Sequence, residues 1–315
     1  TNFGQPTLSL NYDPEVLNGW GTRPYQWEFS TSVQHQLMTR LSLDVGYFRR
    51  LFGNFGVTDN LNLAPSDFGT FAIGVPVDER LPDGGGGTIN GFKDVNPNKA
   101  ATVPNNYFTL ARKYGEQIEH WNGVDVTLNA RIRAGMTLQG GFSTGQRLTD
   151  NCDIIDDVPE AALLTGPYCR QEENFLTDGK LVWTYAIPKI DVNISGLFIS
   201  RPGPAISANR VVPNAEIRPS LGRDLSNNAP NATVNMVHPG TLFGDRRNQL
   251  DLRFTKPFRF GGTRLGVNFE LYNALNTNAV LTENATYRDT TISGWRIPTS
   301  IVPPRFMKFS LQMDF

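Results

Sequence analysis

Apolar and polar residues alternate with a period of two along much of this chain. The last eleven residues show the pattern most clearly, because one parity is apolar throughout: Met307, Phe309, Leu311, Met313 and Phe315. The residues between them are polar, and a β-strand places alternate side chains on opposite faces. The segment therefore predicts a strand with one face towards lipid and one towards water, as in a transmembrane β-barrel.

The same alternation predicts eight earlier strands, arranged as four pairs. They cover residues 25–37 with 41–47, 124–132 with 136–142, 181–187 with 190–198, and 250–254 with 265–271. Only a few residues separate the two strands of each pair, so each pair is a predicted hairpin with a tight turn. Together with the last segment, the pattern predicts about nine or ten strands.

The connections between these pairs are long and rich in Gly, Pro and Asn, and they cover roughly residues 59–115, 147–175, 202–245 and 276–303. Outer-membrane barrels have short periplasmic turns and long extracellular loops. Connections in compact soluble domains have a median length of about 4–6 residues. The predicted fold is therefore all-β, an antiparallel transmembrane β-barrel segment that takes in residues 1–315 as one unit. A soluble carbohydrate-binding β-sandwich would instead have short loops at both ends.

Strand direction bears on whether the barrel is whole. The last predicted strand runs towards the short turns, and with nine strands the first must run the same way. Ordinary bacterial barrels have an even strand number, so we expect the carboxy-terminal part of a larger barrel, unless a further strand lies within 59–115. The chain begins at Thr1 with neither an initiator Met nor a secretory signal, and a processed or partial product is expected.

Composition and charge narrow the function classes. The formal net charge is −1 over 315 residues, which predicts no nucleic-acid partner. The chain has 30 Gly, 21 Pro and 20 Phe, a composition that suits an all-β chain with long loops. It has no run of about 18 apolar residues, so no transmembrane helix is predicted.

The polar half of the alternation is predicted to face the barrel lumen: Asp125, Asn129, Arg131, Asp191, Asn193, Asp251, Arg253, Asn268 and Glu270. These side chains could keep the lumen wet by pairing with one another or with a plug, or they could guide a polar solute. The sequence leaves both roles open. Trp27, Trp121 and Trp183 fall near predicted strand ends and are predicted at the lipid interface. Trp20 and Trp295 fall in loops, where packing is favoured over ligand contact.

Two cysteines, Cys152 and Cys169, lie in the second long connection. An even count favours a disulfide that closes this loop, and a metal site would need more ligands. The loop also carries four carboxylates, Asp153, Asp156, Asp157 and Glu160. They match no EF-hand spacing, so a solvated acidic loop is favoured over a Ca²⁺ site.

Catalytic and cofactor motifs are not recognisable. His35, His120 and His238 lie far apart and show no zinc-binding spacing. No nucleophile elbow, phosphate-binding loop or paired catalytic carboxylate stands out, so an enzyme is not expected and no cofactor is predicted.

Six segments carry a family resemblance. They are Trp27–Ser30 with Val45–Arg50, Glu119–Asp125, Asn248–Arg253, Glu270–Asn276, and Pro304–Phe306 followed by the terminal Phe315. In these segments the chain resembles the carboxy-terminal barrel of TonB-dependent outer-membrane receptors, especially the subgroup with an amino-terminal carboxypeptidase-regulatory-like domain.

The resemblance implies a place in a Gram-negative-type outer membrane, in contact with its lipid. It implies a plug domain and the TonB complex as partners, which sequence upstream of this chain would supply. It also implies that the barrel-assembly machinery recognises the strand that ends at Phe315. The implied function is energised import of a scarce nutrient bound at the extracellular loops. Siderophore, oligosaccharide, peptide and vitamin all remain open. The alternative function is a structural or adhesive barrel whose exposed loops contact other proteins.

Overall fold

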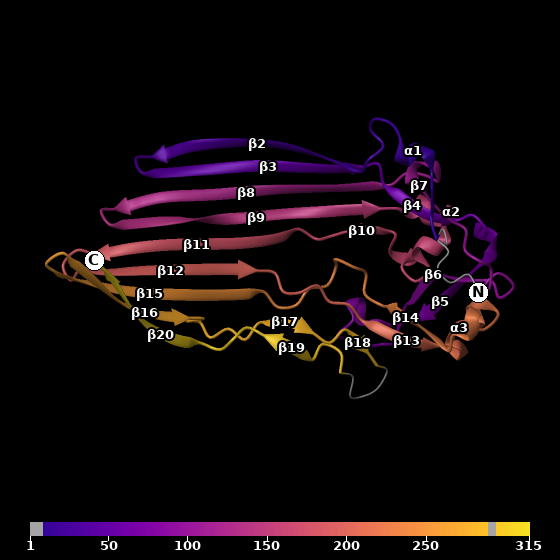
Figure 1. The fold of residues 1–315 in the computed structure, drawn as a ribbon. Helices are drawn as coiled ribbons and strands as arrows, with labels where there is room; N and C mark the ends of the chain where they lie inside the picture. Colours follow the sequence, from indigo (N-terminus) through magenta and orange to yellow (C-terminus); the bar gives the residue numbers. More distant parts are fainter. Residues whose placement is uncertain (1–8, 289–293) are drawn as a thin grey trace.

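In the computed structural model, which describes residues 9–288 and 294–315, one large antiparallel sheet forms most of the molecule (Figure 1). Its strands follow the chain in order: β2 (Tyr25–Met38), β3 (Leu41–Gly53), β8 (Ile118–Arg133), β9 (Met136–Asp150), β11 (Leu176–Ile187), β12 (Val192–Arg201), β15 (Arg247–Phe260), β16 (Thr263–Tyr272) and β20 (Phe306–Asp314). A short tenth strand, β10 (Arg170–Glu172), pairs with the end of β9. The predicted fold class, an all-β antiparallel barrel sheet, is confirmed.

Tight turns join the strands at one end of this sheet, on the left in Figure 1. Each turn contains a residue with positive φ: Arg40, Gly135, Asp191 and Gly261, with φ from 47° to 77°. Left-handed residues of this kind match the twist of two-residue hairpins. Asp191 and Ile190 were predicted on a strand, and that prediction is wrong, because β12 begins only at Val192.

The long connections at the other end are folded rather than irregular. The first holds β4 (Gly56–Asn60), β5 (Phe68–Gly74), β6 (Thr88–Val95), β7 (Asn106–Leu110) and the 3₁₀ turns η1 (Pro65–Asp67), η2 (Pro82–Gly84) and η3 (Ala111–Lys113). The second holds α2 (Cys152–Asp157), η4 (Pro159–Ala162) and η5 (Gly166–Tyr168). The third holds β13 (Asn209–Pro213), α3 (Asn214–Leu221), η6 (Ser226–Asn228) and β14 (Asn231–Asn235), and the fourth holds β17 (Val280–Glu283), β18 (Thr286–Tyr287) and β19 (Pro298–Ile301).

These connections, together with β1 (Asn11–Tyr12) and α1 (Pro14–Leu17), form a unit that we call the loop cap. Most of it lies on the right in Figure 1, with β17 and β19 nearer the middle. Its core brings together Phe71 and Phe92 of the first connection, Ile217 and Val234 of the third, and Trp295 of the fourth. Trp295 is only 2% exposed, so the loop-packing expectation is confirmed for this residue. Trp20 is fully exposed, so the same expectation is wrong for Trp20. Part of the predicted loop 276–303, residues 289–293, lies outside the described residues.

The sheet has two open edges. Among the described residues, β2 pairs only with β3, and β20 pairs only with β16. The strands of the first connection do not fill this gap, because β5 pairs with β6 and the order β1-β7-β4 makes a separate sheet. The alternative of a missed barrel strand within 59–115 is therefore wrong. No helix in the described part of the chain has the length and apolar character needed to cross a membrane.

Candidate functional site: the polar face of the sheet and the loop cap

Cross-strand pairing brings the polar residues of the alternation together on one side of the sheet. Two rows of directly paired neighbours show this: Ser195, Arg253, Glu270 and Lys308, and Asn193, Thr255, Asn268 and Ser310. A third row contains Asp125, and Asn129 pairs with Ser42 and Gln139 on the same side. We call this side the polar face. Of the residues predicted to face the lumen, only Asp191 lies off these strands.

The opposite side, which we call the apolar face, contains the residues that alternate with those of the polar face along each strand. Ile194, Phe254, Phe269 and Phe309 form one of its rows. The side chains of β20 predicted to contact lipid are widely exposed on it: Met307, Phe309, Leu311, Met313 and Phe315. Phe309 is 75% exposed and Leu311 is 72% exposed. On β12, β15, β16 and β20, these rows place residues of opposite parity on opposite faces.

Glu270 is the most buried charged residue of the polar face. It is 9% exposed and lies between two cations, with Arg253 Nε at 3.6 Å and Lys308 Nζ at 3.4 Å from its carboxylate. The Tyr272 hydroxyl also donates to Glu270 Oε2 at 3.2 Å. This cluster links β15, β16 and the edge strand β20 through charge as well as through backbone hydrogen bonds.

Trp121 lies on the polar face, so the prediction that places it at the lipid interface is wrong. It pairs with Arg50 on β3 and Arg147 on β9, and the guanidinium carbon of Arg50 is 5.6 Å from the ring centroid. The ring covers Gly123 and Gly145, where a Cβ would lie 1.9 and 2.3 Å from ring atoms. Residue 121 shares its parity with Asp125, and this signal in the sequence could have given the correct face.

Two hollows open on the polar face. The larger, of about 760 Å³, lies at the turn end and is lined mainly by uncharged polar side chains, among them Gln34, Gln36, Ser42, Asn129 and Gln139, with Arg40 and Arg131. The second, of about 420 Å³, lies nearer the cap where Gly141 leaves space, and it has charged walls: Asp125, Asp178, Lys180 and Arg201. The first hollow is suited to polar groups, whereas the second also has apolar lining from Val126, Phe142, Val182 and Ile199.

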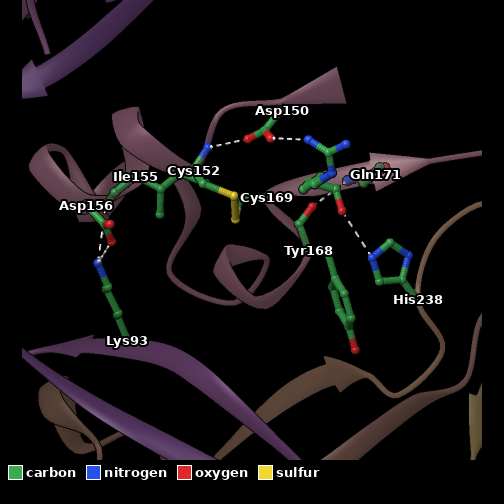
Figure 2. The surroundings of a disulfide bond; sticks show 10 residues. Lys93, Asp150, Cys152, Ile155, Asp156, Tyr168, Cys169, Gln171 and His238 are labelled. Atoms are coloured by element: carbon green, nitrogen blue, oxygen red, sulfur yellow. Dashed lines mark hydrogen bonds and ion pairs between the residues drawn. A yellow bond between two sulfur atoms is a disulfide. The ribbon is translucent and has the colours of Figure 1, made fainter. Parts of the chain in front are cut away.

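The disulfide Cys152–Cys169 closes the second connection, as predicted, with the two Cα atoms 4.8 Å apart. Figure 2 shows that the closed segment reaches towards both neighbouring connections. Lys93 of β6 donates to the carbonyl of Ile155 at 3.1 Å, and His238 of the third connection lies 3.1 Å from the carbonyl of Arg170. The disulfide-closed segment therefore links the first connection to the third.

Tyr168 adds a hydrogen bond between the second and the third connection. Its hydroxyl donates to the carbonyl of Asn235 at 2.5 Å, and its ring meets His238 edge to face at 5.3 Å. Burial raises the pKa of Tyr168 to about 12, because the charged phenolate would lose its hydration. The phenol therefore stays a neutral donor at physiological pH.

Three of the four acidic residues of the disulfide-bonded loop contact protein groups. Glu160 accepts a hydrogen bond from the backbone N–H of Asn60 at 2.7 Å, Asp156 lies 3.6 Å from Lys93 Nζ, and Asp153 accepts from the backbone of Glu116. Within residues 9–288 and 294–315, no three His, Cys, Asp or Glu residues gather as a metal site would require. The carboxylates thus serve as contacts between connections.

A charged cluster fixes α1 against the first connection. Asp13 caps α1 by accepting from the backbone of Glu15 at 2.9 Å, and it is also bonded to Thr109 and to Lys113. The hydrogen bond from Lys113 holds the pKa of Asp13 well below its usual range, and Asp13 in turn raises the pKa of Lys113. Pro14 at the first helical position has no N–H to satisfy.

No protein-family model matches the sequence. No curated protein matches it either. Two solved structures resemble the fold at low sequence identity. One is the ferric-catecholate import receptor Fiu of E. coli K12 in a closed form, with a TM-score of 0.40 and 14% identity over 91% of this chain. The other is the outer membrane transporter YddB of Escherichia coli, with a TM-score of 0.41 and 9% identity over 92% of this chain. The chain spans 27% and 32% of the lengths of these two structures.

Proposed function

We propose that this chain forms the carboxy-terminal, membrane-spanning part of a receptor or transporter barrel in a Gram-negative-type outer membrane. The observation that carries the proposal is the exposed apolar face of a sheet whose other face is polar. Residues such as Phe309 and Leu311 would expose a large apolar patch to water in a soluble protein, and such patches are rare on soluble monomers. Lipid satisfies this face, and a water-filled lumen satisfies the other.

The open edges support a larger barrel. Nine alternating strands make β2 and β20 run in the same direction, so the two edges could meet only as a parallel pair. An all-antiparallel barrel needs an odd number of further strands between them. Unpaired edge groups are costly in lipid, so we assign these further strands to the rest of the same barrel.

The resemblance of the strand motifs to TonB-dependent receptors supports the finer part of the proposal. The loop cap faces the outside and meets a scarce nutrient, a plug fills the lumen beside the polar face, and TonB moves the plug. The hollows on the polar face, including that around Gln139 and Arg131, then lie along the path of the solute.

Paired spin labels test the orientation of the faces. We would replace Leu311 and the adjacent Ser310 separately by cysteine in the full-length protein, attach a nitroxide to each, and reconstitute the proteins in liposomes. The native cysteines are bonded to each other and take no label. The label at 311 should collide with oxygen dissolved in lipid, and the label at 310 should collide with a water-soluble nickel chelate. Equal access of both labels to nickel would remove the proposal, as would recovery of the protein in the soluble fraction of cells.

The packed cap supports a second candidate function, a structural or adhesive barrel. Because Phe71, Ile217 and Trp295 share one core, the connections form a stable body that could contact other surface proteins. Uptake and adhesion assays on cells with and without TonB separate the two functions. TonB-dependent uptake of a solute supports transport, whereas adhesion that is unchanged without TonB supports the alternative.

A further inference from the structure

One row of cross-strand neighbours on the polar face separates its charges by sign. From β8 to β15 the row contains Asp125, Ser143, Asp178, Arg201 and Arg247. Neighbouring strands lie about 4.8 Å apart, so the two acidic and the two basic residues occupy opposite ends of a short line. The basic end lies where β12 ends and β15 begins, immediately below the loop cap.

The basic end contains a like-charge pair. Arg201 and Arg247 are direct partners in the β12–β15 register, and like charges in that position destabilise a sheet unless something offsets them. Arg201 lies 3.3 Å from Asp178, which offsets one charge. Arg247 has no ion pair among the described residues, and its Nε–H is buried without a hydrogen-bond partner there. A buried donor of this kind costs free energy until an acceptor reaches it.

Lys180 adds a third cation. It lies on β11, paired with Ile199 of β12, two residues from Asp178 on the same face. It makes no ion pair within the part of the chain that the structure describes. Lys180, Arg201 and Asp178 all line the charged hollow of about 420 Å³. Space for a ligand therefore adjoins Lys180 and Arg201, and Asp125 and Asp178 line the same hollow.

We infer that Arg247, Arg201 and Lys180 form a binding site for an anionic group of a solute, a carboxylate or a phosphate. Guanidinium groups bind both planar carboxylates and phosphates through paired N–H donors, and a lysine adds a point charge. An anion between Arg201 and Arg247 would offset their repulsion and satisfy the Nε–H of Arg247. The inference rests on the proposed function only in placing this site in the lumen, below the cap.

Isothermal titration of the full-length protein in detergent at low salt tests the site, with inorganic phosphate and citrate as separate probes. We expect saturable binding of at least one probe, and the preferred probe identifies the anion class. Arg247→Gln should weaken that binding tenfold or more. The matched control is Arg264→Gln, which alters another arginine of the polar face, paired across strands with Asp314. Its affinity should equal that of the unmodified protein.

Two outcomes overturn the inference: neither probe binds, or Arg247→Gln binds as tightly as Arg264→Gln. Lys180→Gln covers the case in which Arg247→Gln does not fold, because the Lys180 side chain makes no hydrogen bond or ion pair among the described residues. It should weaken binding severalfold, and unchanged binding would count against the site. Failure of the proposed function is recognised separately, by the spin labels at 310 and 311.

Discussion

The carboxylate of Asp251 accepts a hydrogen bond from the backbone N–H of Asn273 at 2.8 Å. Asn273 follows the last residue of β16 and has a φ of 49°. Its side chain donates to the carbonyls of Thr277 and Pro303, both at 2.9 Å, and accepts from the backbone of Thr277. One buried amide thus joins the end of β16 to both sides of the last connection, and Asp251 joins it to β15.

Asn273→Ala should lower the free energy of unfolding by about 1–3 kcal/mol, because the backbone N–H and carbonyl of Thr277 and the carbonyl of Pro303 lose this partner. Urea unfolding of the protein in detergent, followed by tryptophan fluorescence, measures the change. Asn227→Ala is the control: Asn227 has a similar φ of 55° but is exposed and makes no side-chain hydrogen bond among the described residues. A similar loss in both variants would show that the backbone conformation matters and the amide contacts do not.

The disulfide gives a second prediction. Replacing both Cys152 and Cys169 by serine opens a segment with a sequence separation of 17, and the chain-entropy estimate for such a loop is about 3 kcal/mol. We expect the loop cap to become sensitive to protease between residues 151 and 175 while the strands stay protected. Reduction of the unmodified protein by dithiothreitol should reproduce the effect. An unchanged cleavage pattern under both treatments would contradict the bridging role of this segment.

The strands could be predicted from the sequence because parity fixes the face of every residue in an antiparallel sheet. Phe254, Phe269 and Phe309 fall in one row as their spacing requires. Trp121 departed from expectation because its residue type suggested the lipid interface while its parity placed it on the polar face. Asp191 departed because the turn takes in two more residues, Ile190 and Asp191, than the alternation indicates.

The cap and the arginine pair could not be predicted in the same way. Phe71, Ile217 and Trp295 share one core although each comes from a different connection, and no local pattern specifies which loops pack together. Arg201 and Arg247 become neighbours only through the register of β12 and β15. That register depends on how the whole third connection folds.

Glu270→Gln should weaken the attachment of the edge strand. The substitution keeps the shape of the side chain but removes the charge between Arg253 and Lys308, which are 47% and 58% exposed. Water screens these two cations in part, so we expect a loss of about 1–2 kcal/mol, between the values for exposed and buried pairs. Thermal unfolding monitored by gel mobility measures it. The control, Asp314→Asn, removes an exposed carboxylate of the edge strand β20 and should have no measurable effect. Equal midpoints for both variants would contradict the prediction.

Gly196→Ala tests the packing of the apolar face. A Cβ at position 196 would lie 2.0 Å from the Trp183 ring, which covers this glycine from the neighbouring strand. The ring must move, and we expect a cost of about 1–3 kcal/mol, as for other overpacked sites. A shift in tryptophan emission should accompany the lower stability. Gly262→Ala is the control, because a Cβ there has nothing within 4 Å. Identical unfolding curves for the two variants would show that Trp183 adapts without cost.

Acid should loosen the loop cap through Asp78. Hydrogen bonds from Arg80, the closest at 2.6 Å, hold the pKa of Asp78 at about 2, below its ordinary value of 3.8. As the pH falls, the unfolded chain therefore takes up a proton before the folded cap does, so the contribution of Asp78 to the stability of the cap is complete above pH 3.8 and is lost as the pH falls towards 2.

Proteolysis of the cap by pepsin across this range should show the loss. Asp78→Asn should weaken the cap at pH 5 and flatten its response to acid. Asp83→Asn, in the same connection but exposed, should keep the full response. A response of Asp78→Asn as steep as that of Asp83→Asn would assign the acid sensitivity to other carboxylates.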